Sequence, residues 1–215
     1  MKLQYNLITV LPDKPNQKIT VAGVELSIAN VWEEQKHAIT SGIVTGVPVS
    51  NYYNPDDPLM SLPHDTPMEL QEGDRVIFHY LAIKRSQIQY NDSYVISYDS
   101  VFCAIRNGQV IPINGWVIVE ADRKDKYGDL GFIVPDSTKD QVDECFGTVL
   151  WVGQPLLAIA SDPDYSPSYL DEIRAGDHVG FSPHYAVPLE YTLHGELDTK
   201  SQLYRIQHRN IILKD

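Results

Sequence analysis

Apolar and polar residues alternate along much of this chain, and a period of two is typical of β-strands with one buried face. Gly, Pro, Asn and Asp separate the alternating segments, as expected for turns between short strands. Helical periodicity is almost absent, and the two best helical candidates, 30–42 and 136–147, have weak patterns. The pattern predicts an all-β fold of the sandwich or barrel type, with long loops, little helix and strands at 7–11, 42–49, 74–80, 93–97, 116–120, 147–152 and 204–207.

Four motifs occur twice along the chain in the same order, which indicates an internal repeat. The second copies follow the first at distances of 109, 108, 105 and 103 residues, a slow drift that changes in loop length would produce. We interpret the chain as a tandem duplication, with one unit at 1–108 and the other at 109–215. The pairs are NLITVLPD (6–13) with GWVIVEAD (115–122), AGVEL (22–26) with LGFIV (130–134), SGIVTGV (41–47) with FGTVLWVG (146–153), and ELQEGDRVIFHY (69–80) with EIRAGDHVGFSPHY (172–185).

A Gly-Asp dipeptide precedes an alternating segment in each copy, at Gly73–Asp74 and Gly176–Asp177. Glycine adopts the positive φ of a tight turn without steric cost, and aspartate can hydrogen-bond the backbone of such a turn. Each dipeptide therefore predicts a turn that leads directly into a strand.

The second copy of the second motif contains an apolar triplet, Phe132–Val134, in an otherwise polar stretch. Charged residues flank it at 122–126 and again at 136–140, and Gly131 and Pro135 bound it directly. Two interpretations stay open: a short edge strand packed on its own domain, or an exposed loop that docks on another protein. The repeat alignment favours the exposed loop.

The order and spacing of these motifs resemble the GroES-type, ten-kilodalton co-chaperonin family. In that family a first strand precedes a mobile loop with Gly and three mostly apolar residues, followed by a G-x-V-x-x-V-G strand, a roof hairpin and V-G-D-x-V-x-F. The second unit has WVIVEAD (116–122), GFIVP (131–135), GTVLWVG (147–153) and AGDHVGF (175–181), and the first has LITVLPD, AGVELS, GIVTGV and EGDRVIF. The resemblance covers nearly the whole chain in two copies and implies two tandem GroES-like β-barrels.

The resemblance also implies a function: capping a GroEL-type chaperonin, with ATP bound to that partner, as part of a homo-oligomeric ring. The implied chaperonin-binding residues are Gly131, Phe132, Ile133 and Val134 in the second unit, and Gly23, Val24 and Leu26 in the first. In the first unit Glu25 stands in the centre of the triplet, where a carboxylate disfavours an apolar groove unless it points outward or meets a basic partner.

Net charge and cysteine content narrow the class of protein. The formal charge is −12, so phosphate-rich partners such as nucleic acid and anionic membranes are disfavoured. Cys103 and Cys145 belong to no metal-ligand spacing and are expected to be reduced thiols. No signal peptide and no membrane-spanning run is evident, so a cytoplasmic protein is expected.

Enzyme chemistry has no support in the motifs of the chain. No HExxH, GxSxG, Walker loop or GxGxxG before a helix is present, so we expect no catalytic residues, no cofactor and no metal. An alternative class is a structural or assembly protein, for example a virus-particle subunit, that reuses the barrel without capping. Glu25 and the long Tyr- and Pro-rich segments at 50–66 and 159–172, which are either ordinary surface loops or a binding patch, motivate that alternative.

Overall fold

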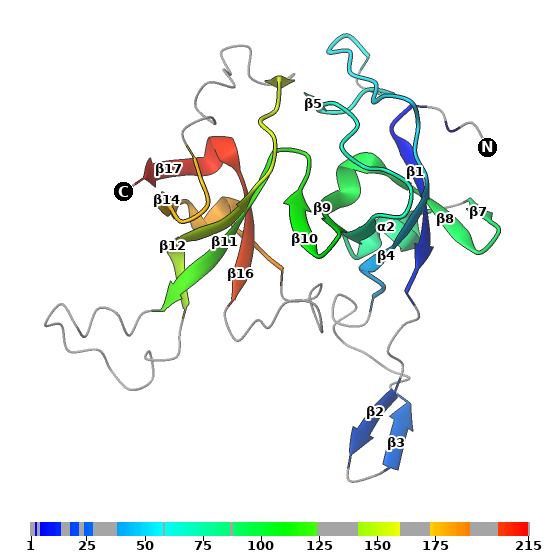
Figure 1. Cartoon of the computed structure of the whole chain (residues 1–215), viewed down its shortest axis with the longest axis horizontal. Coiled ribbons are helices and arrows are strands. Elements are labelled where there is room, and N and C mark those ends of the chain that lie inside the picture. The colour runs from blue at the N-terminus through cyan, green and yellow to red at the C-terminus, as the bar shows by residue number, and fades with distance from the viewer. Residues whose placement is uncertain are drawn as a thin grey trace, which may run out of the picture. The chain divides into compact units, whose positions relative to one another are not determined.

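The computed structural model describes most of the chain as two compact units (Figure 1). Unit 1 comprises Met1–Leu62 and Pro67–Asn107, and unit 2 comprises Pro63–Thr66 and Gly108–Asp215. The described residues are 3, 5–13, 18–21, 24–27, 38–57, 59–86, 88–123, 142–159, 173–189 and 202–214.

Strands dominate both units, and the described residues contain one short α-helix. The first part of the chain forms β1 (Leu7–Pro12), β2 (Lys18–Val21), β3 (Val24–Ser27), β4 (Ser41–Gly46), β5 (His64–Asp65), β6 (Arg75–Phe78), α2 (Leu81–Arg85), β7 (Gln89–Tyr90), β8 (Ser93–Ser97), the 3-10 helix η1 (Tyr98–Ser100), β9 (Val101–Arg106) and β10 (Gln109–Pro112). The remainder forms β11 (Trp116–Arg123), β12 (Val142–Val152), β13 (Ala158–Ile159), β14 (His178–Phe181), η4 (Pro183–Tyr185), β15 (Val187–Pro188), β16 (Leu203–Gln207), η5 (His208–Asn210) and β17 (Ile211–Lys214).

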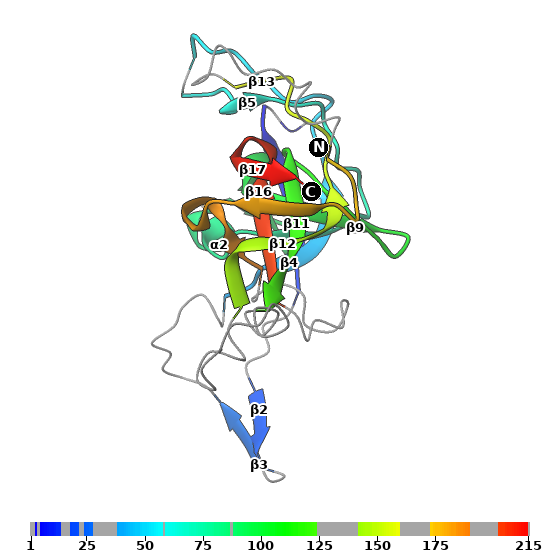
Figure 2. The same ribbon diagram turned by 90° about the vertical axis from the view of Figure 1, so that its left-hand side faces the viewer.

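Two antiparallel sheets with the same strand order organise the chain. The seven-stranded sheet has the order β10-β9-β6-β4-β1-β8-β7, and the six-stranded sheet has the order β15-β16-β11-β12-β14-β17. Reversed, the second order is β17-β14-β12-β11-β16-β15, which corresponds strand by strand to β9-β6-β4-β1-β8-β7 in the first sheet. In Figure 2, β14 runs across the direction of β16, so the six-stranded sheet is strongly twisted.

The register of the central strand pairs repeats as well. In the first sheet Val10 lies opposite Val44 and Pro12 opposite Gly42, after a register shift between Thr9 and Val10. In the second sheet Val119 lies opposite Val149 and Ala121 opposite Gly147, and the equivalent shift falls between Ile118 and Val119. Register, bulge and strand order therefore agree with the duplication that the four motifs indicate.

Each sheet buries an apolar core that is built from equivalent positions. Buried residues match in pairs because equivalent positions of each strand point toward the core in both units. The matching pairs are Ile8 and Val117, Val10 and Val119, Val44 and Val149, Val76 and Val179, Phe78 and Phe181, and Ile96 and Ile206.

One glycine in each unit permits the close approach of the first two long strands. A Cβ atom on Gly42 would lie 2.5 Å from the carbonyl oxygen of Leu11 and 2.6 Å from a methyl group of Val10. A Cβ atom on Gly147 would collide with the carbonyl oxygen of Glu120 and with Val119 in the same way. A side chain at either position would force the two strands apart.

Unit 2 also includes a short strand from the long segment that precedes the first Gly-Asp turn. The strand β5 pairs with β13, with His64 opposite Ile159 and Asp65 opposite Ala158. The amide of Leu157 also donates to the carbonyl of Asp65, at 2.9 Å. A piece of the first repeat is thus built into the second unit, which the sequence did not indicate.

The predicted β-rich architecture is confirmed, since each of the seven predicted segments overlaps a strand. The helix α2 was not predicted, and Val142–Phe146, within the weak helical candidate 136–147, lies in β12. Neither sheet closes into a barrel within the described residues, where each ends in edge strands.

Candidate functional site

The implied binding residues fall in two connections that join equivalent strands. We call residues 14–40, between β1 and β4, the first connection, and residues 124–141, between β11 and β12, the second connection. Gly23 and Gly131–Val134 lie outside the described residues. Val24 and Leu26 lie on β3.

The strands β2 and β3 form a hairpin within the first connection, where the resemblance implied a mobile loop (Figure 1). Its register places Val24 opposite Val21 and Leu26 opposite Ile19. Because successive residues of a strand alternate between its faces, Val24 and Leu26 occupy positions of one face and Glu25 a position of the other. Position 25 therefore alternates with positions 24 and 26 along β3.

A polar contact set closes the base of the first connection, and we call it the first stem clamp. Asp13, directly after β1, accepts hydrogen bonds from both terminal nitrogens of Arg75, at 3.4 and 2.8 Å. The hydroxyl of Ser41, at the start of β4, donates to the same carboxylate. Since β4 lies between β1 and β6, the clamp joins two strands that are not neighbours.

Unit 2 has a second stem clamp at the equivalent positions, with different chemistry. The Nε2 atom of His178 on β14 lies 2.9 Å from Oδ2 of Asp122, near the end of β11. The ring of Phe146 on β12 stacks on His178, with 6.0 Å between ring centroids and an interplanar angle of 10°. The ladder between β11 and β12 shifts between Ala121 and Arg123, so Asp122 lies at a bulge, which can redirect a side chain.

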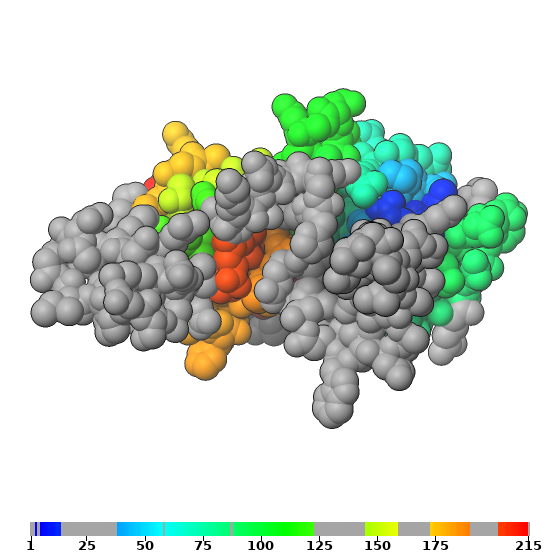
Figure 3. Space-filling model, turned by 90° about the horizontal axis from the view of Figure 1, so that it is seen from below, coloured from blue at the N-terminus to red at the C-terminus, as the bar shows by residue number. Residues whose placement is uncertain are grey.

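The two clamps lie at the strand ends from which the connections start. In the space-filling view of Figure 3, β1 is dark blue and part of β16 is orange-red. The side chains of Arg75 and Asp13 are 35% and 34% exposed, and those of His178 and Asp122 are 37% and 15% exposed. Partial exposure suits clamps that fasten a connection to the sheet.

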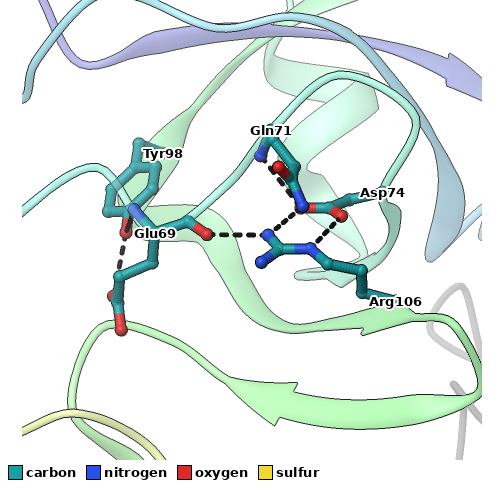
Figure 4. A network of polar contacts seen from close by, with 5 residues as sticks. All are labelled: Glu69, Gln71, Asp74, Tyr98 and Arg106. Carbon is teal, nitrogen blue, oxygen red and sulfur yellow. Dashed lines mark hydrogen bonds and ion pairs between the residues drawn. The ribbon is translucent and has the colours of Figure 1, made fainter.

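A second polar network fastens the first Gly-Asp turn (Figure 4). Asp74 is 2% exposed and accepts two hydrogen bonds from Arg106, at 2.8 and 2.7 Å, and a third from the amide of Gln71, at 2.9 Å. Arg106 also donates to the carbonyl of Glu69, at 3.0 Å. These hydrogen bonds to Asp74 raise the pKa of Arg106.

The second Gly-Asp turn keeps the backbone hydrogen bonds and replaces the arginine. The amide of Arg174 donates to Asp177, and the ammonium group of Lys214 lies 2.9 Å from the same carboxylate. The hydrogen bond from Lys214, followed by that from the Arg174 amide, lowers the pKa of Asp177. In both units the glycine amide donates to the facing strand, from Gly73 to Val44 and from Gly176 to Val149.

Buried ionisable groups in both units are shifted toward their uncharged forms. Burial, with the nearby charge of Glu69, raises the pKa of Tyr98, whose hydroxyl donates to Glu69 at 2.9 Å. Burial lowers the pKa of Arg205, which lies over the Trp116 ring at 4.5 Å, to about 10. Burial also lowers the pKa of His208 and raises that of Cys103 to about 12, so the Cys103 thiol is unreactive at neutral pH.

Within the part of the chain that the structure describes, no group of three or more His, Cys, Asp and Glu residues is placed to hold a metal ion. None of the helices in that part is both long enough and apolar enough to cross a membrane.

Comparison with known proteins adds no identification. Neither a scan of known protein families nor a search of curated proteins gives a match for this chain.

Sequence reasoning missed the stem clamps, although their signal was present in the repeat. The motifs ending at Asp13 and Asp122 align with each other, and the motifs that contain Arg75 and His178 also align. An acidic residue and a basic residue recurring together at equivalent positions indicate a contact between them. The identity of the middle residue, Ser41 in one unit and Phe146 in the other, carries no such signal.

Proposed function

We propose that this chain is a co-chaperonin-like protein that caps a GroEL-type chaperonin and assists protein folding. Each unit would be a GroES-like domain, and the apolar residues of the two connections would bind grooves of the chaperonin. ATP would bind the partner and not this chain, and the complex would form in the cytoplasm. The observation that carries the proposal is the shared architecture: equivalent strands, with one clamp at the base, flank both connections.

The physical chemistry of the second triplet suits reversible docking. Phe132, Ile133 and Val134 stand between charged stretches, which oppose collapse of the triplet onto the domain. Ordering such a segment on a partner costs conformational entropy, so each contact is weak. Several weak contacts around a ring add through multivalency and still allow release.

Edge strands offer a route to the ring that capping requires. The strand β17 is an edge of the six-stranded sheet, and Ile212 and Leu213 on it are 69% and 58% exposed. An exposed apolar edge strand is a template for pairing with another chain. Head-to-tail pairing of chains in this way would form a closed ring if the rotation closes. Whole two-unit chains cannot tile seven positions, so the ring would differ in symmetry from a seven-fold cap or leave units out.

Chaperonin ATPase activity and refolding of a stringent client test the proposal directly. With purified full-length chain in excess, we expect the ATPase rate to change and the refolding yield to rise. Ile133→Asp should abolish both effects, while Val24→Asp, the matched change in the first connection, should have the smaller effect because Glu25 already interrupts that triplet. Circular dichroism and thermal unfolding verify that both variants fold. An unchanged ATPase rate and yield with excess wild-type chain would refute capping.

A structural or assembly role is the second candidate, and the β2–β3 hairpin favours it. A strand pair in the first connection is closer to a packed assembly element than to a loop that orders only on binding. Particle images of the chain, alone and with chaperonin and nucleotide, separate the two functions. A stable particle of the chain alone, unaltered by the chaperonin, would support the structural role.

A further inference from the structure

We propose that Asn107–Gly108 is a site of spontaneous covalent modification, at which Asn107 is converted to aspartate and isoaspartate. The second Asn-Gly dipeptide of the sequence, Asn114–Gly115, is protected from the same reaction by its surroundings. The inference does not depend on the proposed function, because the reaction needs only the chain and water.

Both dipeptides adopt the same type of backbone turn. The φ angles are 53° and 77° at Asn107 and Gly108, and 54° and 67° at Asn114 and Gly115. Two successive residues with positive φ are typical of a type I′ turn, for which Asn-Gly is a preferred dipeptide. The residues that allow each tight turn are also the pair most open to intramolecular attack, because Gly has no side chain to hinder it.

The reaction consumes one water molecule and releases one molecule of ammonia. The main-chain nitrogen of Gly108 loses its proton and attacks Cγ of Asn107. The bond between Cγ and the side-chain nitrogen breaks, and this nitrogen takes up a proton and leaves as ammonia. Water then opens the cyclic imide at either carbonyl, which gives aspartate, or isoaspartate with an additional carbon atom in the main chain. Either product adds a carboxylate where unit 1 ends and unit 2 begins.

The surroundings of the two asparagines differ. Asn107 and Gly108 are the residues between β9 and β10, and both are exposed. Asn114 is 1% exposed, and Oδ1 of its side-chain amide lies 3.4 Å from Nε2 of His64. Formation of the imide requires the asparagine to rotate out of its turn conformation. Such local opening costs little free energy at an exposed turn and much more at a packed one.

The main chain at Gly115 is packed as well as the side chain of Asn114. A Cβ atom on Gly115 would lie 2.6 Å from Cγ of Leu156, so this leucine packs directly on the turn. The amide of Trp116 donates to the carbonyl of Ile113 at 3.1 Å and closes the turn. A Cβ atom on Gly108, in contrast, would meet no atom within 4 Å. Attack at Asn114 must therefore displace packed groups, whereas attack at Asn107 need not.

Peptide mapping of the full chain, aged in mildly alkaline buffer, tests the proposal. Chromatography separates the asparaginyl, aspartyl and isoaspartyl peptides, and mass spectrometry identifies them at successive times. In the folded chain we expect Asn107 to convert at least about ten-fold faster than Asn114, because the buried turn must open first. In guanidinium chloride, where both turns are lost, the two rates should become similar. Equal rates in the folded chain, or an Asn107 that stays intact, would overturn the proposal.

The turn at Asn91–Asp92 provides a matched control within the same chain. Both residues are exposed and have positive φ, 47° and 63°. Because the side chain of Asp92 hinders attack by its own main-chain nitrogen, Asn91 should convert more slowly than Asn107. Conversion of Asn91 as fast as that of Asn107 would contradict the assignment to the Asn-Gly pair.

Hydroxylamine provides a second readout, because it cleaves the chain at the cyclic imide. The folded chain should be cut after Asn107, which releases a fragment that begins GQVIPI. Asn107→Asp, whose short polar side chain also tolerates positive φ, should abolish this cut. A fragment that begins GWVIVE as the main product would place the reaction at Asn114 and overturn the proposal.

Discussion

Units 1 and 2 share one sheet order but fasten it with different polar groups. The order of six strands, the central register and six pairs of buried apolar positions correspond. At the Gly-Asp turn, however, Asp74 is held by a bidentate arginine, and Asp177 by a lysine whose side chain is 39% exposed. A planar guanidinium matches both oxygens of a carboxylate, whereas an ammonium group is a single point charge.

A second difference between the units is the first residue of the 3-10 helix that follows β8 in unit 1 and β16 in unit 2. Tyr98 in unit 1 and His208 in unit 2 are both buried at the start of η1 and η5. The hydroxyl of Tyr98 contacts the carboxylate of Glu69, while Nε2 of His208 lies 3.3 Å from the carbonyl oxygen of Gly153. Unit 1 therefore buries a group that stays neutral at neutral pH, and unit 2 buries one that acid can charge.

These differences indicate which residues are free to differ between the two units and which are not. Apolar positions inside a sheet are coupled to many neighbours, so a change in volume at one position is felt by all of them. Polar contacts at strand ends involve two or three groups, and another donor can replace the first. The core and the turn backbone therefore match between the units, whereas the side chains that fasten them differ.

The largest expected loss of stability comes from substituting Gly42 and Gly147, the glycines that permit the close approach of β1 to β4 and of β11 to β12. Gly42→Ala and Gly147→Ala should each destabilise the protein by about 3 kcal/mol, because the new methyl group collides with a backbone carbonyl. Urea unfolding measures the loss for each variant. Gly108→Ala is the control: it has a positive φ of 77° and no atom within 4 Å of the added Cβ, so it isolates backbone strain of about 1 kcal/mol. Equal losses in all three variants would show that the close approach is not maintained.

The Gly-Asp turns should rank next and should differ between the units. Asp74→Asn leaves Arg106 without its carboxylate at a nearly buried position and should cost about 2–3 kcal/mol. Asp177→Asn removes a more exposed contact with Lys214 and should cost less than about 1 kcal/mol. Thermal and urea unfolding compare the two, with Arg106→Lys as an intermediate that keeps the charge. If both asparagine variants lose the same stability, the turns are energetically equivalent despite their different partners.

The smallest effect should appear only in acid and only through unit 2. Burial lowers the pKa of His208, so the unfolded state binds the proton more readily than the folded state. The stabilising contribution is therefore complete above about pH 6.5, the ordinary value, and is lost as the pH falls from there through the lowered pKa of the folded state. Its slope cannot exceed about 1.4 kcal/mol per pH unit, the limit for one proton.

The comparison for this effect is His208→Gln, whose amide can still donate to Gly153. The free energy of unfolding of this variant should lose the acid-dependent slope that the wild-type chain shows between pH 7 and pH 5. The Nδ1 atom of His208 is buried without a hydrogen-bond partner in the described structure, so a proton there would be uncompensated. Identical slopes in the variant and the wild type would assign the acid sensitivity to other groups.

Much of the sheet was predictable because its strands carry the alternation that burial of one face requires. The segments at 7–11, 93–97 and 116–120 fall within β1, β8 and β11. The Gly-Asp dipeptides predicted turns, and both glycines have positive φ, 92° and 93°. The hairpin β2–β3 and the pair β5–β13 were not predicted, because two to four residues without a longer alternating segment around them establish no period.

The sequence by itself determined the β class, the two-fold internal repeat and the turns, because alternation, collinear motifs and Gly-Asp dipeptides are local properties that occur once in each unit. Only the tertiary structure decided which polar groups meet. The partners Asp13 and Arg75 are far apart along the chain, and so are Asp122 and His178. They meet because β4 lies between β1 and β6 in the first sheet, and β12 lies between β11 and β14 in the second. A contact across a middle strand depends on strand order and register together, and neither is written in the pattern of any single segment.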